Sequence, residues 1–231
     1  MCGRFVIEFS PGLVAKVFRL PEVPDLSPRY NVAPSQSVPV IRETLGGQRR
    51  LVMVRWGLIP SWSKESGGGL INARSESVND KPSFRLSFRQ RRCILPASGF
   101  YEWARVEGKK VPYYVRMADG SPMPLAGIWD EWHAPGGALL QTCAILTTAA
   151  NETVASIHAR MPVILAPEAF DLWLSRHVHN GDELQPLCAP YPSGRIETFP
   201  VSPLVNNSAN DSPECIAPAR PDGSASSVGI I

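Results

Sequence analysis

Cys2 is the residue of this chain whose type and position suggest the most unusual chemistry. If Met1 is removed, Cys2 becomes the first residue and carries a free α-amine beside its thiol. An amine condenses with an aldehyde to an imine, and a thiolate can attack the same carbon to close a five-membered thiazolidine ring. Ordinary pKa values, about 7.7–8.0 for the amine and about 8.5 for the thiol, leave useful fractions of both nucleophiles near neutral pH. The alternative is a small buried hydrophobe, the commoner role of a free cysteine.

A second candidate group follows the apolar pair at 70–71. The side chain of Asn72 offers one acceptor and two donors, so it could hold an amine in place. Arg74 would point the same way in an extended chain and could clamp a phosphate. For any single pair of this kind, a turn asparagine and a surface arginine are the commoner roles.

Glu102 lies between Tyr101 and Trp103 in an aromatic strand pattern. A carboxylate in such a strand is either a solvated residue of a half-buried sheet or a general acid/base with a raised pKa. Strand alternation favours the solvated position.

His158 and Arg160 occupy alternate positions just before an apolar run at 161–165. A histidine at such a strand entry is a candidate proton shuttle, and a structural histidine is the alternative. Trp62, in a loop that ends in three glycines, is either a packed lid residue or an exposed platform on which a base stacks. Several arginines then form a local basic patch that the net charge of +2 hides: Arg85, Arg89, Arg91 and Arg92.

The elements that must position these residues can be predicted from periodicity and from capping residues. Ser10 and Pro11 begin a helix that ends before Pro21. Strands are expected over 4–7, 38–42, 50–58, 141–147 and 196–201, with further strands across 92–132. Gly46 and Gly47 predict a hairpin between the strands at 38–42 and 50–58. Helices are expected over 83–90 and 151–157 and from Pro167 onward.

Composition bounds the class of protein. With 231 residues, 44% of them apolar and 19% charged, the chain is long enough for one large domain with a sizeable core. Its 23 prolines favour a loop-rich β architecture. Five cysteines without a C-x-x-C pair argue against a disulfide framework and a structural zinc site, and for a reducing compartment. No signal peptide or membrane-spanning run is apparent, so a cytoplasmic protein is expected.

Several polar blocks occur together in an unbroken order. They are Met-Cys-Gly-Arg at 1–4, Trp-Gly-Leu-Ile-Pro-Ser-Trp at 56–62, Asn-Ala-Arg-Ser-Glu at 72–76, Gly-Phe-Tyr-Glu-Trp at 99–103, Ile-His-Ala-Arg-Met-Pro at 157–162 and Val-Ser-Pro-Leu-Val-Asn-Asn at 201–207. In this set the chain closely resembles the SRAP (SOS-response-associated peptidase) family, whose members shield abasic sites in single-stranded DNA. The resemblance covers nearly all of residues 2–218.

The resemblance implies a role for each matching residue. Cys2, freed of Met1, would form a thiazolidine with the sugar aldehyde, Asn72 would position the new N-terminus, Glu102 would assist proton transfer, and His158 would promote ring opening and Schiff-base formation. The implied DNA contacts are Arg4, Pro34, Trp62, Trp103, Arg74 and Arg160, the last two on the backbone beside the lesion. The chain departs from some relatives in having Trp62 alone where they carry an aromatic pair, which leaves the strength of base stacking open.

The fold implied by the resemblance is a mixed α/β (α+β) single domain with a curved, mainly antiparallel β-core, flanked by short helices, over residues 1–218. A disordered tail is expected at 219–231. The implied partner is single-stranded DNA containing abasic sites, without a cofactor, metal or membrane, and the expected state is a cytoplasmic monomer, nucleoid-associated in a bacterium. A weak lyase activity and self-removal of Met1 are implied as by-products.

Two other functions remain open from the residues alone. The first is a cysteine peptidase that acts on other proteins, with Cys2 as nucleophile and His158 as base. The second is a non-catalytic single-strand binder, in which Cys2→Ala would leave function unchanged.

Overall fold

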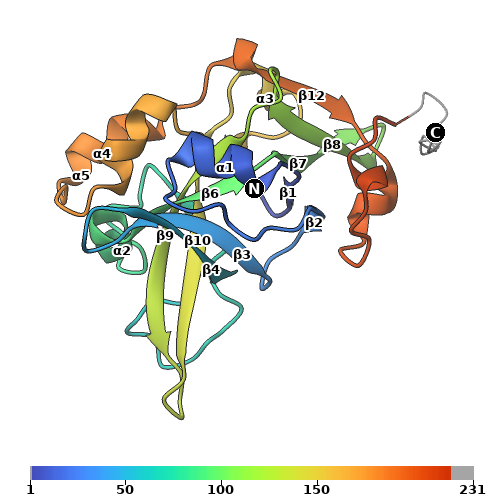
Figure 1. The fold of residues 1–231 in the computed structure, drawn as a ribbon. Coiled ribbons are helices and arrows are strands. Elements are labelled where there is room, and N and C mark those ends of the chain that lie inside the picture. The colour runs from blue at the N-terminus through green and yellow to red at the C-terminus, as the bar shows by residue number, and fades with distance from the viewer. Residues whose placement is uncertain (1, 220–231) are drawn as a thin grey trace.

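Two β-sheets form the framework of the computed structural model, which describes residues 2–219 (Figure 1). Strands form where β-branched and aromatic residues alternate between the clusters of turn residues. The strands are β1 Phe5–Ile7, β2 Arg29–Val32, β3 Ser37–Glu43, β4 Arg49–Trp56, β5 Asn72–Arg74, β6 Arg92–Ala97, β7 Gly99–Val106, β8 Lys109–Met117, β9 Met123–His133, β10 Leu139–Ala149, β11 Arg160–Pro162 and β12 Ile196–Pro200.

The larger sheet curls until it closes on itself. Its strand order is β11-β10-β4-β3-β6-β9, and β9 also pairs with β10, so that five strands form a ring. Two pairings to β10, from β4 and β5, are parallel, and the other strand pairings are antiparallel. Closure removes most of the free strand edges that an open sheet would expose.

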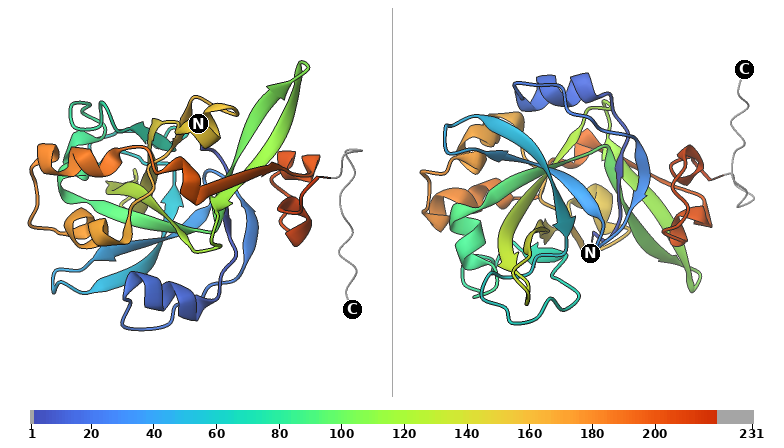
Figure 2. Two further views of the ribbon diagram at one scale, coloured as in Figure 1. Left: turned by 90° about the horizontal axis from the view of Figure 1, so that it is seen from above. Right: turned by 60° about the horizontal axis from the view of Figure 1, so that its bottom comes forward.

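The smaller sheet has the order β12-β8-β7-β1-β2 and is antiparallel throughout. Its β1 strand lies between β2 and β7, which brings the start of the chain into the middle of the fold. Figure 2 shows β7 and β8 continuing as a hairpin that projects beyond the body of the molecule.

Helices are short and lie outside the sheets (Figure 1). The first begins as its capping sequence predicts, because the side chain of Ser10 accepts a hydrogen bond from the amide of Leu13 and proline follows at the first helical position. The α-helices are α1 Pro11–Phe18, α2 Arg85–Gln90, α3 Glu152–Ala155, α4 Phe170–Leu174 and α5 Gly181–Leu184, and the 3-10 turns are η1 Pro167–Ala169, η2 Gln185–Cys188, η3 Ser193–Arg195, η4 Pro203–Asn206 and η5 Pro213–Cys215.

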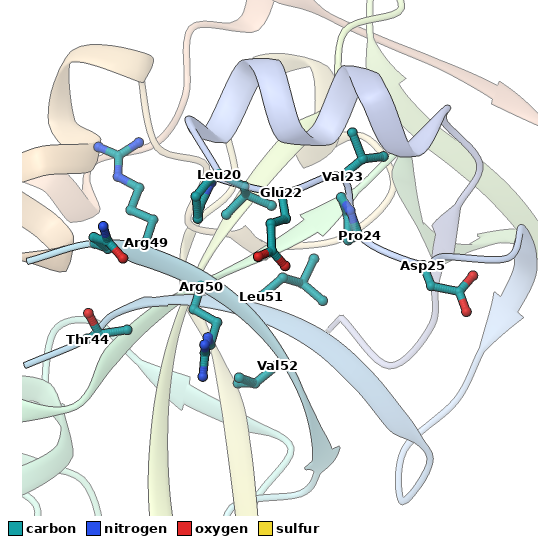
Figure 3. Close-up of a pocket in the computed structure, with 12 residues that line it drawn as sticks. Leu20, Glu22, Val23, Pro24, Asp25, Thr44, Arg49, Arg50, Leu51 and Val52 are labelled. Carbon is teal, nitrogen blue, oxygen red and sulfur yellow. The ribbon is translucent and has the colours of Figure 1, made fainter. Parts of the chain in front are cut away.

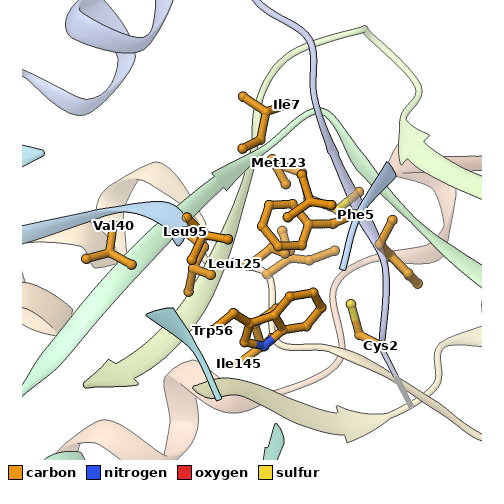
Figure 4. Packing of buried hydrophobic residues seen from close by; sticks show 14 of the residues in the cluster. Cys2, Phe5, Ile7, Val40, Trp56, Leu95, Met123, Leu125 and Ile145 are labelled. Atoms are coloured by element: carbon orange, nitrogen blue, oxygen red, sulfur yellow. The ribbon is translucent and has the colours of Figure 1, made fainter. Parts of the chain in front are cut away.

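The ring of strands encloses one hydrophobic cluster, and Cys2 is a member of it. Figure 4 shows the Cys2 side chain among those of Phe5 and Trp56, in the cluster that also holds Leu125 and Ile145. A second cluster joins the outer face of the ring to the helices. The start of the chain is thus anchored by hydrophobic packing.

Most of the expected elements are present. The mixed, mainly antiparallel single-domain fold is confirmed, as is the hairpin through Gly46 and Gly47. Within the described part of the chain, no helix is long and apolar enough to cross a membrane. The expected removal of Met1 lies outside the described residues, and so does the expected tail, apart from Ala219.

The predicted arginine patch is wrong in part. Arg92 is 4% exposed, and its guanidinium donates to backbone carbonyl groups around α4, those of Trp173 and Val178 among them. Arg91 pairs with the buried carboxylate of Asp130. Only Arg85 and Arg89 of the four are fully exposed, because the strand that follows α2 turns the other two toward the core.

Candidate functional site

Strand β1 places the start of the chain along one edge of β7. Phe5 pairs with Phe100 and Val6 with Gly99, and the amide of Tyr101 donates to the carbonyl of Arg4 over 3.0 Å. Continuing this antiparallel register by one more residue brings Glu102 opposite the residue before Arg4. The register of β1 on β7 therefore places Glu102 and the first residues of the chain side by side.

Cys2 is fully buried in the chain that carries Met1. Its thiol makes a long contact, 3.9 Å, to the carbonyl of Arg4. Burial, and next the negative charge of Glu102, raise the pKa of the Cys2 thiol well above its ordinary range. In this form the sulfur is a neutral thiol at physiological pH.

Asn72 contacts Cys2 directly. It opens β5, which runs parallel to β10 with Asn72 beside Ile145. Its side-chain nitrogen donates to the carbonyl of Cys2 over 2.8 Å. The other side-chain atom, Oδ1, is buried and has no hydrogen-bond partner among the described residues. Asn72 thus holds Cys2 with one end of its amide and keeps an acceptor available with the other.

Glu102 is 3% exposed, so the expectation that it occupies the solvated face is wrong. Strand alternation does hold, since Glu102 and Tyr101 point to opposite faces, but both faces of β7 are covered at this level. Tyr101 packs in a third cluster that includes Val201 and Val205 of the C-terminal segment. Glu102, on the other face, lies near enough to Cys2 for its charge to raise the pKa of that thiol. Both faces are thus covered by residues about a hundred positions away, which local alternation does not reveal.

His158 lies in the turn between α3 and β11. Its Nδ1 is 3.0 Å from the amide nitrogen of Arg160 and 3.1 Å from the carbonyl oxygen of the same residue. The amide always donates, so this contact favours the tautomer with its proton on Nε2, whereas the carbonyl contact favours a proton on Nδ1. The backbone amide of His158 donates to Val154, which fixes the ring relative to α3.

Arg160 and Glu76 form a two-point ion pair, with Nη–Oε distances of 2.5 and 2.9 Å. The guanidinium also donates to the carbonyl of Thr147 over 2.6 Å. Hydrogen bonding from Arg160 lowers the pKa of Glu76, and the charge of Arg74 acts in the same direction. Arg74 itself is exposed and pairs along β5 with Thr147 of β10. Two arginines and one carboxylate therefore surround the same point of β10.

Arg4 lies in an internal network. It donates to the side chain of Asn31 over 2.7 Å and to the carbonyl of Val205 over 2.8 Å. Trp103 is held similarly, because its indole nitrogen donates to Asn206 over 2.7 Å. The predicted DNA contacts of Arg4 and Trp103 remain predictions. Both side chains also bind η4, Arg4 from the start of the chain and Trp103 from β7.

Trp62 is 64% exposed, in the loop between β4 and β5. The ends of that loop are joined by a bridge between Leu58 and Leu70. The exposure favours the platform interpretation over a packed lid. Pro34 is half-buried in the turn that follows β2.

A surface hollow elsewhere has a volume of about 820 Å³ (Figure 3). It lies between the chain segment after α1 and the β3–β4 hairpin, with Glu22, Arg49 and Arg50 among its lining residues. None of the predicted site residues lines this hollow, so it is separate from the candidate site.

Two residues of the site region, Glu76 and Asn31, were not predicted from the sequence. Glu76 ends the polar block at 72–76. A carboxylate two residues beyond Arg74 is the local sequence signal that could have indicated an ion pair. Asn31 is 1% exposed and joins Arg4 to the carbonyls of residues 205, 207 and 210. No local pattern indicates such a long-range contact.

Comparisons with known proteins agree with one another. The model of the SOS response associated peptidase (SRAP) family matches residues 1–208. The chain is 42% identical over 223 residues to abasic site processing protein YoqW of Bacillus subtilis (strain 168), covering 94% of this chain and 99% of that protein. It is 35% identical to abasic site processing protein HMCES of Mus musculus, covering 95% of this chain and 76% of that protein. A crystal structure of a protein from Bacteroides thetaiotaomicron has a TM-score of 0.85 at 26% identity and covers 95% of this chain and 100% of that one.

Proposed function

The chain belongs to the SOS response associated peptidase (SRAP) family, and from this premise we propose that it processes abasic sites in single-stranded DNA by forming a covalent crosslink through Cys2. The observation that carries the proposal is the 2.8 Å hydrogen bond from Asn72 to the carbonyl of Cys2, with Glu102 buried and close enough for its charge to raise the pKa of the Cys2 thiol. The abasic site as substrate is inferred from the names of the relatives, and the crosslinking reaction is inferred from the amine and thiol of Cys2.

The reaction begins with removal of Met1, which frees the α-amine of Cys2. The amine attacks the open-chain aldehyde of the abasic sugar, and loss of water gives an imine. The thiol then adds across the C=N bond: sulfur bonds to carbon, and its proton ends on nitrogen. Having both nucleophiles on one residue makes the second step intramolecular, which favours ring closure.

Asn72 and Glu102 would prepare the amine. The buried Oδ1 of Asn72 would accept a hydrogen bond from the new amine, while Nδ2 keeps the carbonyl of Cys2 in place. Glu102 would remove a proton from the ammonium to release the nucleophile and return it to the departing water. A carboxylate at this depth exchanges protons with few competing waters.

His158 would act on the sugar. Only the open form of an abasic site carries an aldehyde, so a group that moves a proton to the ring oxygen raises the reactive fraction. The tautomer favoured by the amide of Arg160 leaves Nε2–H as the donor. The same group would assist reversal of the imine.

Single-strand preference follows from the position of Cys2. The lesion sugar must reach the buried start of the chain, which an unpaired, kinked strand permits more readily than a duplex. The exposed Arg74 would hold the backbone, and the exposed Trp62 would stack on a neighbouring base, worth roughly 1–3 kcal/mol. We propose that the protein acts as a monomer.

Lyase and self-processing activities belong to the same proposal. An imine that does not close to the sulfur ring permits β-elimination and strand cleavage, so weak lyase activity is expected as a by-product. If the site also removes Met1 itself, the substitution Glu102→Gln should leave Met1 attached in a host that lacks methionine aminopeptidase activity.

A denaturing gel tests the proposal. Wild type and Cys2→Ser are incubated with an abasic single-stranded oligonucleotide, with and without borohydride. Without borohydride, we expect wild type but not Cys2→Ser to form a stable crosslink. With borohydride, Cys2→Ser should also form one, because serine can form a reducible imine but no sulfur ring. A wild-type protein that leaves the oligonucleotide unmodified, with Met1 verified as absent by mass spectrometry, would refute the proposal.

A further inference from the structure

The β7–β8 hairpin continues past the candidate site as a narrow cationic ribbon. Strand β7 carries Trp103, a predicted DNA contact, and at about 3.3 Å per residue Arg105 lies roughly 7 Å farther along on the same face. Register pairs Arg105 with Lys110 and Val106 with Lys109. All three cations are exposed, and Figure 2 shows this hairpin extending beyond the rest of the molecule.

The hairpin has a fixed shape. Its turn residues Glu107 and Gly108 have φ angles of 49° and 80°, the positive values that a two-residue turn of the tightest kind requires. Beyond Trp103 no third strand of the described chain flanks the ribbon, because β1 pairs with β7 only near Phe100 and the pairing of β12 with β8 ends at Tyr113. Within residues 2–219, both strand edges of the tip are therefore unpaired.

The cations at the tip repel one another. Arg105 and Lys110 lie directly opposite each other, an arrangement of like charges that disfavours strand pairing. None of the ion pairs among residues 2–219 includes either of them or Lys109. A two-stranded ribbon buries little apolar surface, so hydrophobic packing offsets little of this repulsion. An anionic ligand on the hairpin would remove it.

We propose that the β7–β8 hairpin is a second DNA contact, on which Arg105, Lys109 and Lys110 bind the sugar–phosphate backbone of the strand that flanks the lesion. This inference rests on the proposed function, because the flanking strand must leave the site where Cys2 holds the lesion. Charge complementarity and continuity along β7 favour this polyanion over an acidic protein. The hairpin would add affinity and fix the direction in which the strand leaves.

The double variant Arg105→Gln/Lys110→Gln tests the proposal, with Lys16→Gln/Arg50→Gln as the control that removes two exposed cations from α1 and β4. Binding is measured by fluorescence anisotropy with undamaged single strands, one of about 25 nucleotides and one of about 6. We expect roughly tenfold weaker binding of the long strand by the hairpin variant and a smaller effect with the short one. The salt slope should fall by about 0.7 for each phosphate that the variant no longer neutralises.

Thermal unfolding separates binding from folding. The hairpin variant removes a repulsive pair, so its Tm should equal or exceed that of wild type. Equal affinities of the hairpin and control variants for the long strand would overturn the inference and leave an acidic protein as the remaining class of partner. If wild type still crosslinks the abasic oligonucleotide in that case, the proposed function stands without the hairpin contact.

Discussion

At the scale of single residues, the chemistry of the site depends on how Cys2 is held. Its thiol is fully buried, and burial together with the charge of Glu102 raises its pKa. A raised pKa means that the thiolate fraction at neutral pH is lower than for a free cysteine, so the sulfur is unreactive while Met1 is present. Removing Met1 places an ammonium group beside the sulfur, which favours the thiolate.

Alkylation of Cys2 should report this difference. We expect iodoacetamide to modify Cys2 at least tenfold more slowly, at pH near 8, in protein that retains Met1 than in processed protein, because only the thiolate reacts. The blocked form should gain reactivity as the pH rises, since its thiol pKa is raised. Peptide mass spectrometry separates Cys2 from the four other buried cysteines, which serve as internal references. Equal rates for the two forms would count against the effect of burial.

At the scale of elements, short segments place the polar residues, and their supports can be tested separately. The loop that carries Trp62 is closed where two glycines touch. Gly69 has a φ of 71°, and a Cβ there would lie 2.5 Å from the carbonyl oxygen of Gly57. A larger residue at this position would meet both the clash and the unfavourable backbone conformation, so the requirement for glycine at Gly69 has a structural reason.

Gly69→Ala should therefore open the neck of this loop. We expect a decrease of about 1–3 kcal/mol in the free energy of unfolding, because the backbone must shift and the left-handed conformation is disfavoured for alanine. Affinity for single-stranded DNA should fall with it, since Trp62 is no longer held in place. Gly68→Ala is the matched control, because a Cβ there meets nothing within 4 Å. Urea unfolding and anisotropy of both variants give the comparison, and indistinguishable variants would contradict the expectation.

The ion pair between Arg160 and Glu76 joins the turn after β5 to the start of β11. It connects the two segments that bear Asn72 and His158, and so sets their spacing. Glu76 is half-exposed, which limits the strength of the pair in water. Its main effect should be on geometry.

A double-mutant cycle measures this coupling. We expect Arg160→Ala and Glu76→Gln each to slow crosslinking, with the double variant little worse than Arg160→Ala, because both remove the same ion pair. The coupling in unfolding free energy should be about 0.5–1 kcal/mol. Glu76→Asp should keep part of the pair and recover part of the rate. Fully additive effects would show that the two residues act independently.

At the scale of the whole molecule, the net charge of +2 conceals an uneven distribution. Arg91 and Arg92 make internal contacts, with Asp130 and with backbone carbonyl groups. The side chain of Arg74 and the cations of the β7–β8 hairpin are exposed to solvent. Exposed charges act over about 8–10 Å at physiological salt, so only those near the site contribute to DNA binding. Binding should be independent of sequence and sensitive to salt.

Arg74→Glu tests the electrostatic part of the site. We expect crosslinking of an abasic oligonucleotide at moderate salt to fall at least tenfold, because a phosphate contact becomes a repulsion, while the Tm stays near that of wild type, since Arg74 is exposed. Arg85→Glu, an exposed site on α2, is the charge-matched control. Unchanged crosslinking by Arg74→Glu, measured over a salt series, would remove Arg74 from the binding surface.

The sequence by itself determined the local features and the family. The cap at Ser10, the hairpin at Gly46 and Gly47 and the ordered polar blocks depend on neighbours in the chain, which is why periodicity and motif order are sufficient to identify them. The tertiary structure alone decided which side chains meet. Asn72 bonds to Cys2, Arg160 to Glu76, and the C-terminal segment covers the strand of Glu102. Each of these contacts spans at least seventy positions, and it depends on ring closure and strand order, which no local pattern encodes.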